Sequence, residues 1–150
     1  MCLVLYLASN GKLPAIDWDA SAPSFYVTPN DPAASNAAAQ FTKTNLAYVG
    51  SDNGCGCGFR AEHDYAIDDP EQLASKTDNQ RRLHDYLVAC LSEEGSVELF
   101  SCWSGDESLP REHERTVKIS ELLSEDFFFL ERQLTIVTAD SDFNPPTTDS

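Results

Sequence analysis

The sequence has few basic residues. Only 10 lysine and arginine side chains stand against 25 acidic ones in 150 residues, which gives a formal charge of −15. A charge of this sign repels the phosphate backbone of nucleic acids and the anionic headgroups of membranes. We therefore expect neither nucleic acid nor a membrane surface as a partner. Most of the acidic side chains lie after residue 50, where they indicate a solvated and highly soluble surface.

Long apolar runs are missing as well. No window approaches the roughly 18 consecutive apolar residues that a membrane span requires. The apolar run from Cys2 to Ala8 is short, and no basic residue precedes it, so it predicts a core strand and not a signal peptide. Together these absences predict a cytoplasmic protein.

The size and composition are those of one domain. With 41% apolar residues, a chain of 150 residues has enough material for one hydrophobic core. We expect a single globular domain over residues 1–139. Residues 140–150, DSDFNPPTTDS, have few apolar groups and two adjacent prolines, which predicts a disordered acidic tail.

Short apolar segments separated by turn residues predict strands, and two Asp-Pro pairs predict helix starts. We expect strands over residues 2–8, 25–27, 45–50, 96–103 and 115–119, and a strand pair or one long bent strand over 127–138. We expect a modest helix from Asp31-Pro32 to about Thr42, a helical turn over 120–123 and one long helix from Asp69-Pro70 to the turn at Gly95. The predicted class is α+β, or a mixed-sheet α/β fold, with one small mixed sheet, one long helix and one or two short ones.

The order of these elements predicts which strand ends lie together. The chain forms a strand-helix-strand unit from the strand at 45–50, the long helix and the strand at 96–103. The two strands of such a unit run parallel in nearly all known cases. Both strands then end at the same edge of the sheet. If the first strand runs antiparallel to them, its starting residue Cys2 lies at that edge too.

Glycine is scarce and unevenly placed. Four of the seven glycines lie in the stretch GSDNGCGCG from Gly50 to Gly58, which also holds Cys55 and Cys57. The chain has five cysteines, an odd number, and no export signal, so we expect reduced thiols and no disulfide framework. Cys90 falls on the apolar stripe of the predicted long helix, where a small core residue is expected.

Two cysteines on a glycine-framed loop predict a site for a thiophilic metal, zinc first. Glycine lets such a loop bend two sulfurs toward one ion without a Cβ clash. We expect thiolates from Cys55 and Cys57, with Cys102, Cys2 or the imidazole of His63 completing a tetrahedron.

Three other interpretations remain open. The loop residues Cys55 and Cys57 suit thiol redox or cysteine-nucleophile chemistry, since backbone N–H groups and Arg60 stabilise a thiolate. Alternatively the loop is a tight connection whose cysteines are only small residues, in a non-catalytic interaction protein without a ligand. A dinucleotide site is not expected, because Phe59 stands where G-x-G-x-x-G requires its third glycine.

The third interpretation starts at Cys2. Removal of Met1 exposes a cysteine with a free α-amine, followed by a predicted strand. In this respect the chain resembles the start of N-terminal-nucleophile hydrolases such as the glutamine amidotransferase domains, a resemblance that implies Cys2 as nucleophile with its amine as base. The resemblance covers only the first few residues, and Leu3 stands where that family has glycine.

Overall fold

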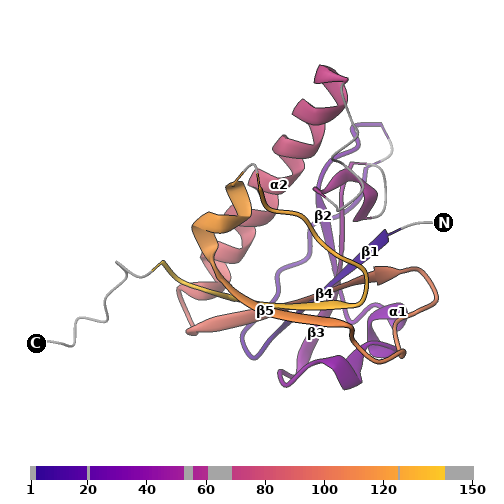
Figure 1. The fold of residues 1–150 in the computed structure, drawn as a ribbon, viewed down its shortest axis with the longest axis vertical. Helices are drawn as coiled ribbons and strands as arrows, with labels where there is room; N and C mark the ends of the chain where they lie inside the picture. Colours follow the sequence, from indigo (N-terminus) through magenta and orange to yellow (C-terminus); the bar gives the residue numbers. More distant parts are fainter. Residues whose placement is uncertain (1–2, 20, 53–55, 61–68, 125, 141–150) are drawn as a thin grey trace, which may run out of the picture.

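A mixed sheet of six strands and one long helix make up the fold (Figure 1). The computed structural model describes residues 3–19, 21–52, 56–60, 69–124 and 126–140. The strands are β1 (Leu3–Ser9), β2 (Tyr26–Pro29), β3 (Asn45–Gly50), β4 (Ser96–Trp103), β5 (His113–Lys118) and β6 (Gln133–Thr138). The helices are α1 (Pro32–Ser35) and α2 (Pro70–Leu91), and the 3-10 helices are η1 (Ala38–Gln40), η2 (Gly56–Gly58) and η4 (Ile119–Leu123). The predicted small α+β fold is confirmed.

The strand directions match the topological prediction. The order across the sheet is β2-β3-β1-β4-β6-β5, with β5 and β6 parallel and the other neighbours antiparallel. Because β1 is antiparallel to both β3 and β4, the latter two run in the same direction and end at the same edge. At that edge Leu3 pairs with Trp103, and Val4 pairs with Cys102.

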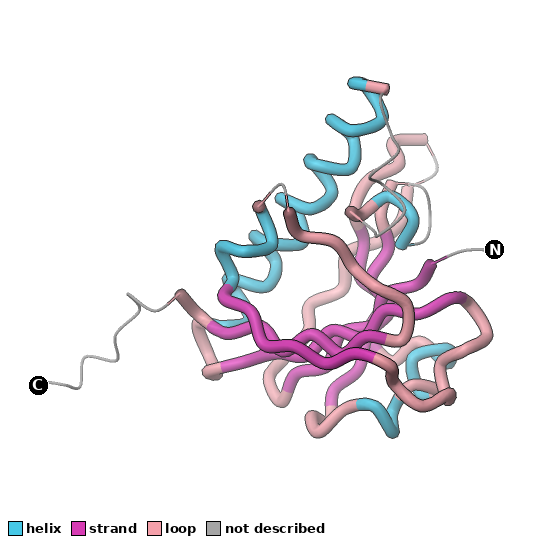
Figure 2. The backbone as a smooth tube through the Cα atoms, viewed as in Figure 1, coloured by secondary structure: helices cyan, strands magenta, loops and turns pink. Residues whose placement is uncertain are grey.

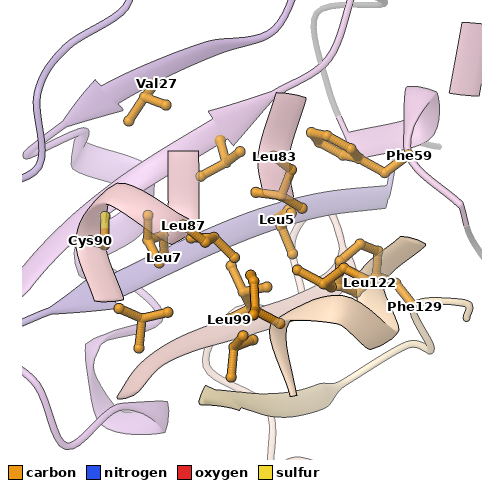
Figure 3. Packing of buried hydrophobic residues seen from close by; sticks show 14 of the residues in the cluster. Leu5, Leu7, Val27, Phe59, Leu83, Leu87, Cys90, Leu99, Leu122 and Phe129 are labelled. Atoms are coloured by element: carbon orange, nitrogen blue, oxygen red, sulfur yellow. The ribbon is translucent and has the colours of Figure 1, made fainter. Parts of the chain in front are cut away.

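The sheet is covered on both faces (Figure 2). Alternate residues of β1 point to opposite sides. Leu3, Leu5 and Leu7 pack with the apolar stripe of α2 in the larger core, which Figure 3 shows around Leu83 and Leu87. Val4 and Tyr6 pack on the other face with small alanines from α1 and the residues after it. β4 is also buried on both faces, because it lies inside the sheet and both faces of the sheet are covered.

Both Asp-Pro pairs start helices as predicted. The carboxylate of Asp31 accepts a hydrogen bond from Ala33 N, and that of Asp69 accepts one from Glu71 N. The prediction of a helix to about Thr42 was too long, because α1 ends at Ser35 and the chain continues into η1. There the amide of Gln40 donates to the carbonyl oxygens of Leu109, at 2.7 Å, and Glu107, at 3.3 Å, and this tertiary contact outweighs the helix propensity of the alanines.

Over 127–138, where a strand pair or one long bent strand is predicted, the structure has the single shorter strand β6, which begins at Gln133. Arg132 has a positive φ of 51°, which interrupts an extended strand. Before it, Phe129 N donates to Arg60 O at 3.0 Å. Phe127 and Phe129 are both in the core.

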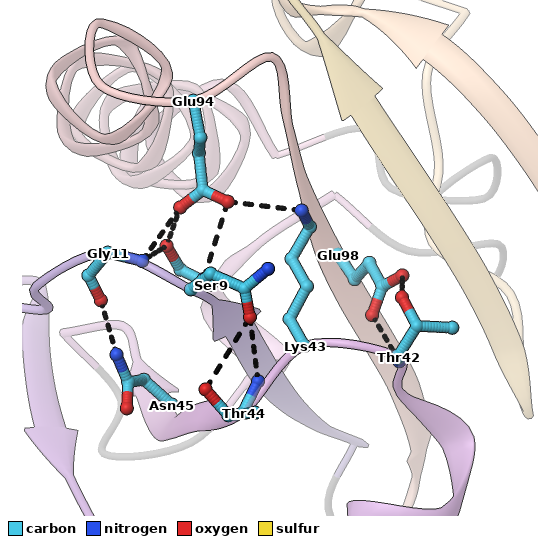
Figure 4. Close-up of polar contacts among 9 residues, drawn as sticks. Ser9, Gly11, Thr42, Lys43, Thr44, Asn45, Glu94 and Glu98 are labelled. Carbon is cyan, nitrogen blue, oxygen red and sulfur yellow. Dashed lines mark hydrogen bonds and ion pairs between the residues drawn. The ribbon is translucent and has the colours of Figure 1, made fainter.

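A carboxylate clasp closes the far end of the sheet, where β1 ends and β3 and β4 begin (Figure 4). Glu94 accepts hydrogen bonds from Ser9 Oγ, from the backbone N–H groups of Asn10 and Gly11, and from Lys43 Nζ at 3.0 Å. Partial burial opposes ionisation of this carboxyl, but the four donors outweigh burial and lower the pKa of Glu94 from 4.5 to about 2. The clasp therefore stabilises the fold through an ionised glutamate.

This clasp makes stability depend on pH. A carboxyl whose pKa is depressed on folding stabilises the native state above its unfolded pKa, and that stabilisation is lost as the pH falls through the folded value. We expect Glu94→Gln to lower the free energy of unfolding by on the order of 2 kcal/mol at pH 7. The difference from wild type should shrink between about pH 4.5 and pH 2. Urea unfolding at several pH values measures it.

The neighbouring exposed glutamate supplies the control. Glu93→Gln removes the same charge one residue earlier and should change stability by less than about 0.5 kcal/mol. A difference for Glu94→Gln that stays constant from pH 7 to pH 2.5, or an equal loss in both variants, would contradict this account of the clasp.

Among the described residues, no helix is both long enough and apolar enough to cross a membrane. The predicted boundary between the domain and its tail stays a prediction, because residues 141–150 lie outside the described residues.

Candidate functional site

The predicted ligands are only partly within the described chain. Cys2, Cys55 and His63 lie outside it. Cys57 is in η2, but its side chain is not among those described. Cys102 is described in full, near the end of β4. Whether the five side chains meet therefore stays a prediction, whereas the segments that hold the loop, η2 and α2, are described.

Two glycines allow η2 to pack closely against its neighbours. A Cβ on Gly56 would lie 2.8 Å from the carbonyl oxygen of Leu3, a backbone atom at the start of β1. A Cβ on Gly58 would lie 2.2 Å from Oγ of Ser51, whose hydroxyl accepts a hydrogen bond from Gly58 N at 3.1 Å. These contacts exclude any larger residue without a shift of the loop. The turn that carries Cys57 is thus fixed on both sides.

A buried amide on α2 holds the same turn. Asn79 is 3% exposed, and its Nδ2 donates to Gly58 O at 3.2 Å, to Asp52 Oδ1 at 2.9 Å and to Ser75 O at 3.0 Å. Its Oδ1 accepts from Asp52 N at 3.3 Å. One side chain therefore ties the residues just before and just after the undescribed part of the loop to the helix.

Two further polar side chains of α2 complete this support. Lys76 is 5% exposed and donates to Phe59 O at 3.3 Å, and Gln80 is 2% exposed and accepts from Arg60 N at 3.3 Å. We call Lys76, Asn79 and Gln80 the polar cradle. Burying three polar groups costs free energy unless their partners are well placed. The loop partners of the cradle lie on either side of the undescribed residues, at Asp52 before them and at Gly58, Phe59 and Arg60 after them.

Phe59 anchors the end of the loop in the core. Its ring is fully buried and makes edge-to-face contacts with Phe25, at a centroid distance of 6.1 Å, and with Phe129, at 6.4 Å. Figure 3 shows Phe59 and Phe129 in the larger core. Such contacts add to the hydrophobic gain of burying the ring. The cysteine loop is consequently attached to the domain by close packing, by polar contacts and by an aromatic core residue.

Cys102 lies on a different side of β1 from the loop. η2 contacts β1, β3 and α2, whereas Cys102 reaches β1 from β4 and packs with Val4 and Phe100 on the face covered by α1. Burial raises the pKa of the Cys102 thiol to about 12, with a smaller contribution from the carboxylates of Glu107 and Asp106. Binding of a metal by Cys102 therefore requires the loss of a firmly bound proton.

The polar cradle is not among the features predicted above, although the sequence of α2 carries a signal for it. The apolar stripe of α2 runs through Leu83, Leu87 and Cys90, and the cradle continues it toward the N-terminus at the same spacings of three and four. Polar residues on the buried stripe of a helix require buried partners. The pattern indicates that this half of the helix packs on backbone and not on apolar side chains.

Over the described part of the chain, no three histidine, cysteine, aspartate or glutamate side chains group closely enough to hold a metal ion. Four of the five predicted ligand side chains are outside that part, so this finding does not test the predicted metal site. Compared with known protein families, with curated proteins and with solved structures, the chain has no match.

Proposed function

We propose that the protein binds one thiophilic metal ion, zinc first, through the thiolates of Cys55 and Cys57. The remaining positions of a tetrahedral site come from Cys2, His63 or Cys102. The observation that supports this proposal is the polar cradle. Its three buried polar side chains form hydrogen bonds with the backbone of one short glycine-rich loop.

The cradle favours a ligand site over a plain connection. A connecting loop lies on the surface and is tolerant of change, whereas a site requires its backbone to be held by supporting contacts. Support of this kind positions the ligands before the metal arrives and reduces the entropy lost on binding. We also propose that the protein is cytoplasmic, because thiols stay reduced there. Its acidic charge disfavours nucleic acids and membranes as partners.

A competition titration against a chromogenic zinc chelator, under anaerobic reducing conditions, tests the proposal. We expect wild type to bind one equivalent of zinc more tightly than micromolar, and Cys55→Ser and Cys57→Ser to weaken binding by on the order of 100-fold or more. Cys90→Ser is the matched control, because Cys90 is a buried thiol of the core on α2 and should leave the affinity unchanged.

The same titration identifies which residues supply the remaining ligands. Loss of affinity in Cys2→Ser, His63→Gln or Cys102→Ser assigns the position, provided that thermal unfolding shows the variant to be folded. A wild-type protein that does not bind zinc, or a Cys55→Ser/Cys57→Ser double variant that binds it as well as wild type does, would refute the proposed function.

A further inference from the structure

A cavity between α2 and η4 has an unusual lining for this acidic chain. Its volume is about 210 Å³, and its walls include Arg60, Gln80, Arg81, Leu122, Leu123 and Ser124. None of its described lining residues is acidic, although acidic side chains outnumber basic ones by 25 to 10 over the sequence. The described lining therefore combines hydrogen-bond donors with an apolar wall and contains no carboxylate.

Gln80 presents a buried donor without an acceptor. Its Oε1 accepts the hydrogen bond from Arg60 N, which fixes the orientation of the amide, because the reverse orientation would set two donors against each other. Its Nε2 is buried and has no hydrogen-bond partner among the described residues. A buried amide without an acceptor is costly, and a small tilt of the Gln80 side chain toward the adjoining cavity would let an acceptor from a ligand remove that cost.

Arg81 brings a positive charge to the cavity. Arg81 is next to Gln80 on α2, and its guanidinium pairs with Asp78 on the exposed side of the helix. Arg60 lies at the end of the cysteine loop, with its guanidinium 4.9 Å from the ring centroid of Phe128. A guanidinium presents several N–H donors in one plane, which match the two oxygens of a carboxylate.

We propose that this cavity binds a small organic carboxylate. The carboxylate oxygens accept hydrogen bonds from Gln80 Nε2 and the Arg81 guanidinium, and the organic part packs on Leu122 and Leu123. The cavity is smaller than the roughly 300–1,000 Å³ of pockets for drug-sized ligands, so it fits a molecule of a few carbon atoms. This site shares no ligand residue with the proposed metal site and does not depend on it.

The carboxylate is favoured over inorganic phosphate by the apolar wall. Leu122 is buried in the core and Leu123 is exposed beside the cavity, so together they offer apolar surface from the interior to the rim. An inorganic phosphate has no apolar part to cover that surface, whereas a short-chain carboxylate covers it. Phosphate is therefore the competing anion in the test.

The test uses butyrate as probe on the full chain, followed by the ¹H–¹⁵N resonances of the Gln80 side-chain amide and the backbone of α2. We expect saturable shifts of these resonances, with a dissociation constant roughly in the millimolar range, as befits a ligand of so few atoms. Butyramide, which has the same shape without the charge, should produce no saturable shift.

Two adjacent arginines give a matched pair of variants. Arg81→Met should weaken butyrate binding about tenfold. Arg82→Met should not, because Arg82 also pairs with Asp78 but does not line the cavity. Both side chains are largely exposed, so both variants should fold. No saturation with butyrate, equal binding of butyramide, tighter binding of inorganic phosphate, or an equal loss in both variants would each overturn the proposal.

Discussion

Replacing Phe59 by alanine should lower the free energy of unfolding by about 3–5 kcal/mol, the largest effect expected of any change near the cysteine loop. The ring is fully buried, and it joins the loop to Phe25 before β2 and to Phe129 before β6. Removing it leaves a cavity at the meeting point of three segments that are far apart in the sequence. Urea unfolding followed by tryptophan fluorescence measures the loss.

An exposed leucine serves as the control for this change. Leu109→Ala also removes a large apolar side chain, but from an exposed position in a loop, and it should change stability by less than about 0.5 kcal/mol. If Phe59→Ala costs no more than Leu109→Ala, Phe59 does not anchor the loop as described.

Asn79→Ala should cost about 3 kcal/mol, the second largest effect. The substitution removes three donated hydrogen bonds and one accepted bond at a position that is 3% exposed. It leaves the carbonyl of Gly58 and the backbone N–H of Asp52 without the partner that the amide supplies, and each buried group without a partner costs about 1–3 kcal/mol. Equilibrium unfolding in urea is again the measurement.

A second measurement separates a supporting role from a purely structural one. If the cradle holds a metal site, Asn79→Ala should also weaken zinc binding about tenfold at a temperature where the variant is fully folded, although Asn79 is not a ligand. The control is Asn36→Ala, the same chemical change at an exposed position. Unchanged zinc affinity in folded Asn79→Ala would show that the cradle stabilises the fold without supporting the site.

The sequence was informative where local signals and topology agreed. The two Asp-Pro pairs marked the starts of α1 and α2, and the strand-helix-strand order predicted that β3 and β4 point the same way. The failures came where tertiary contacts override local preference. Gln40 reaches the carbonyl groups before β5 and ends the helical stretch early, and Arg132 turns the chain before β6.

The candidate site was harder to predict than the fold. The spacing of Cys55 and Cys57 drew attention to the loop, but nothing local to the loop shows how it is held. Its support comes from α2, whose residues Lys76 and Asn79 acquire a role only when the helix packs on the loop backbone. The order of the elements predicts the crossover but not which residues of α2 meet the loop backbone, because these contacts join segments that are about 20 residues or more apart.

The most direct test of the metal proposal is the intact mass of the protein purified anaerobically from cells, recorded under native and then denaturing conditions. The account predicts a native mass that exceeds the sequence mass by one zinc ion, an excess that disappears on denaturation and is absent in Cys55→Ser/Cys57→Ser. A native mass without any metal would contradict it. A mass that is also short by two hydrogens would point instead to a disulfide between two of the thiols.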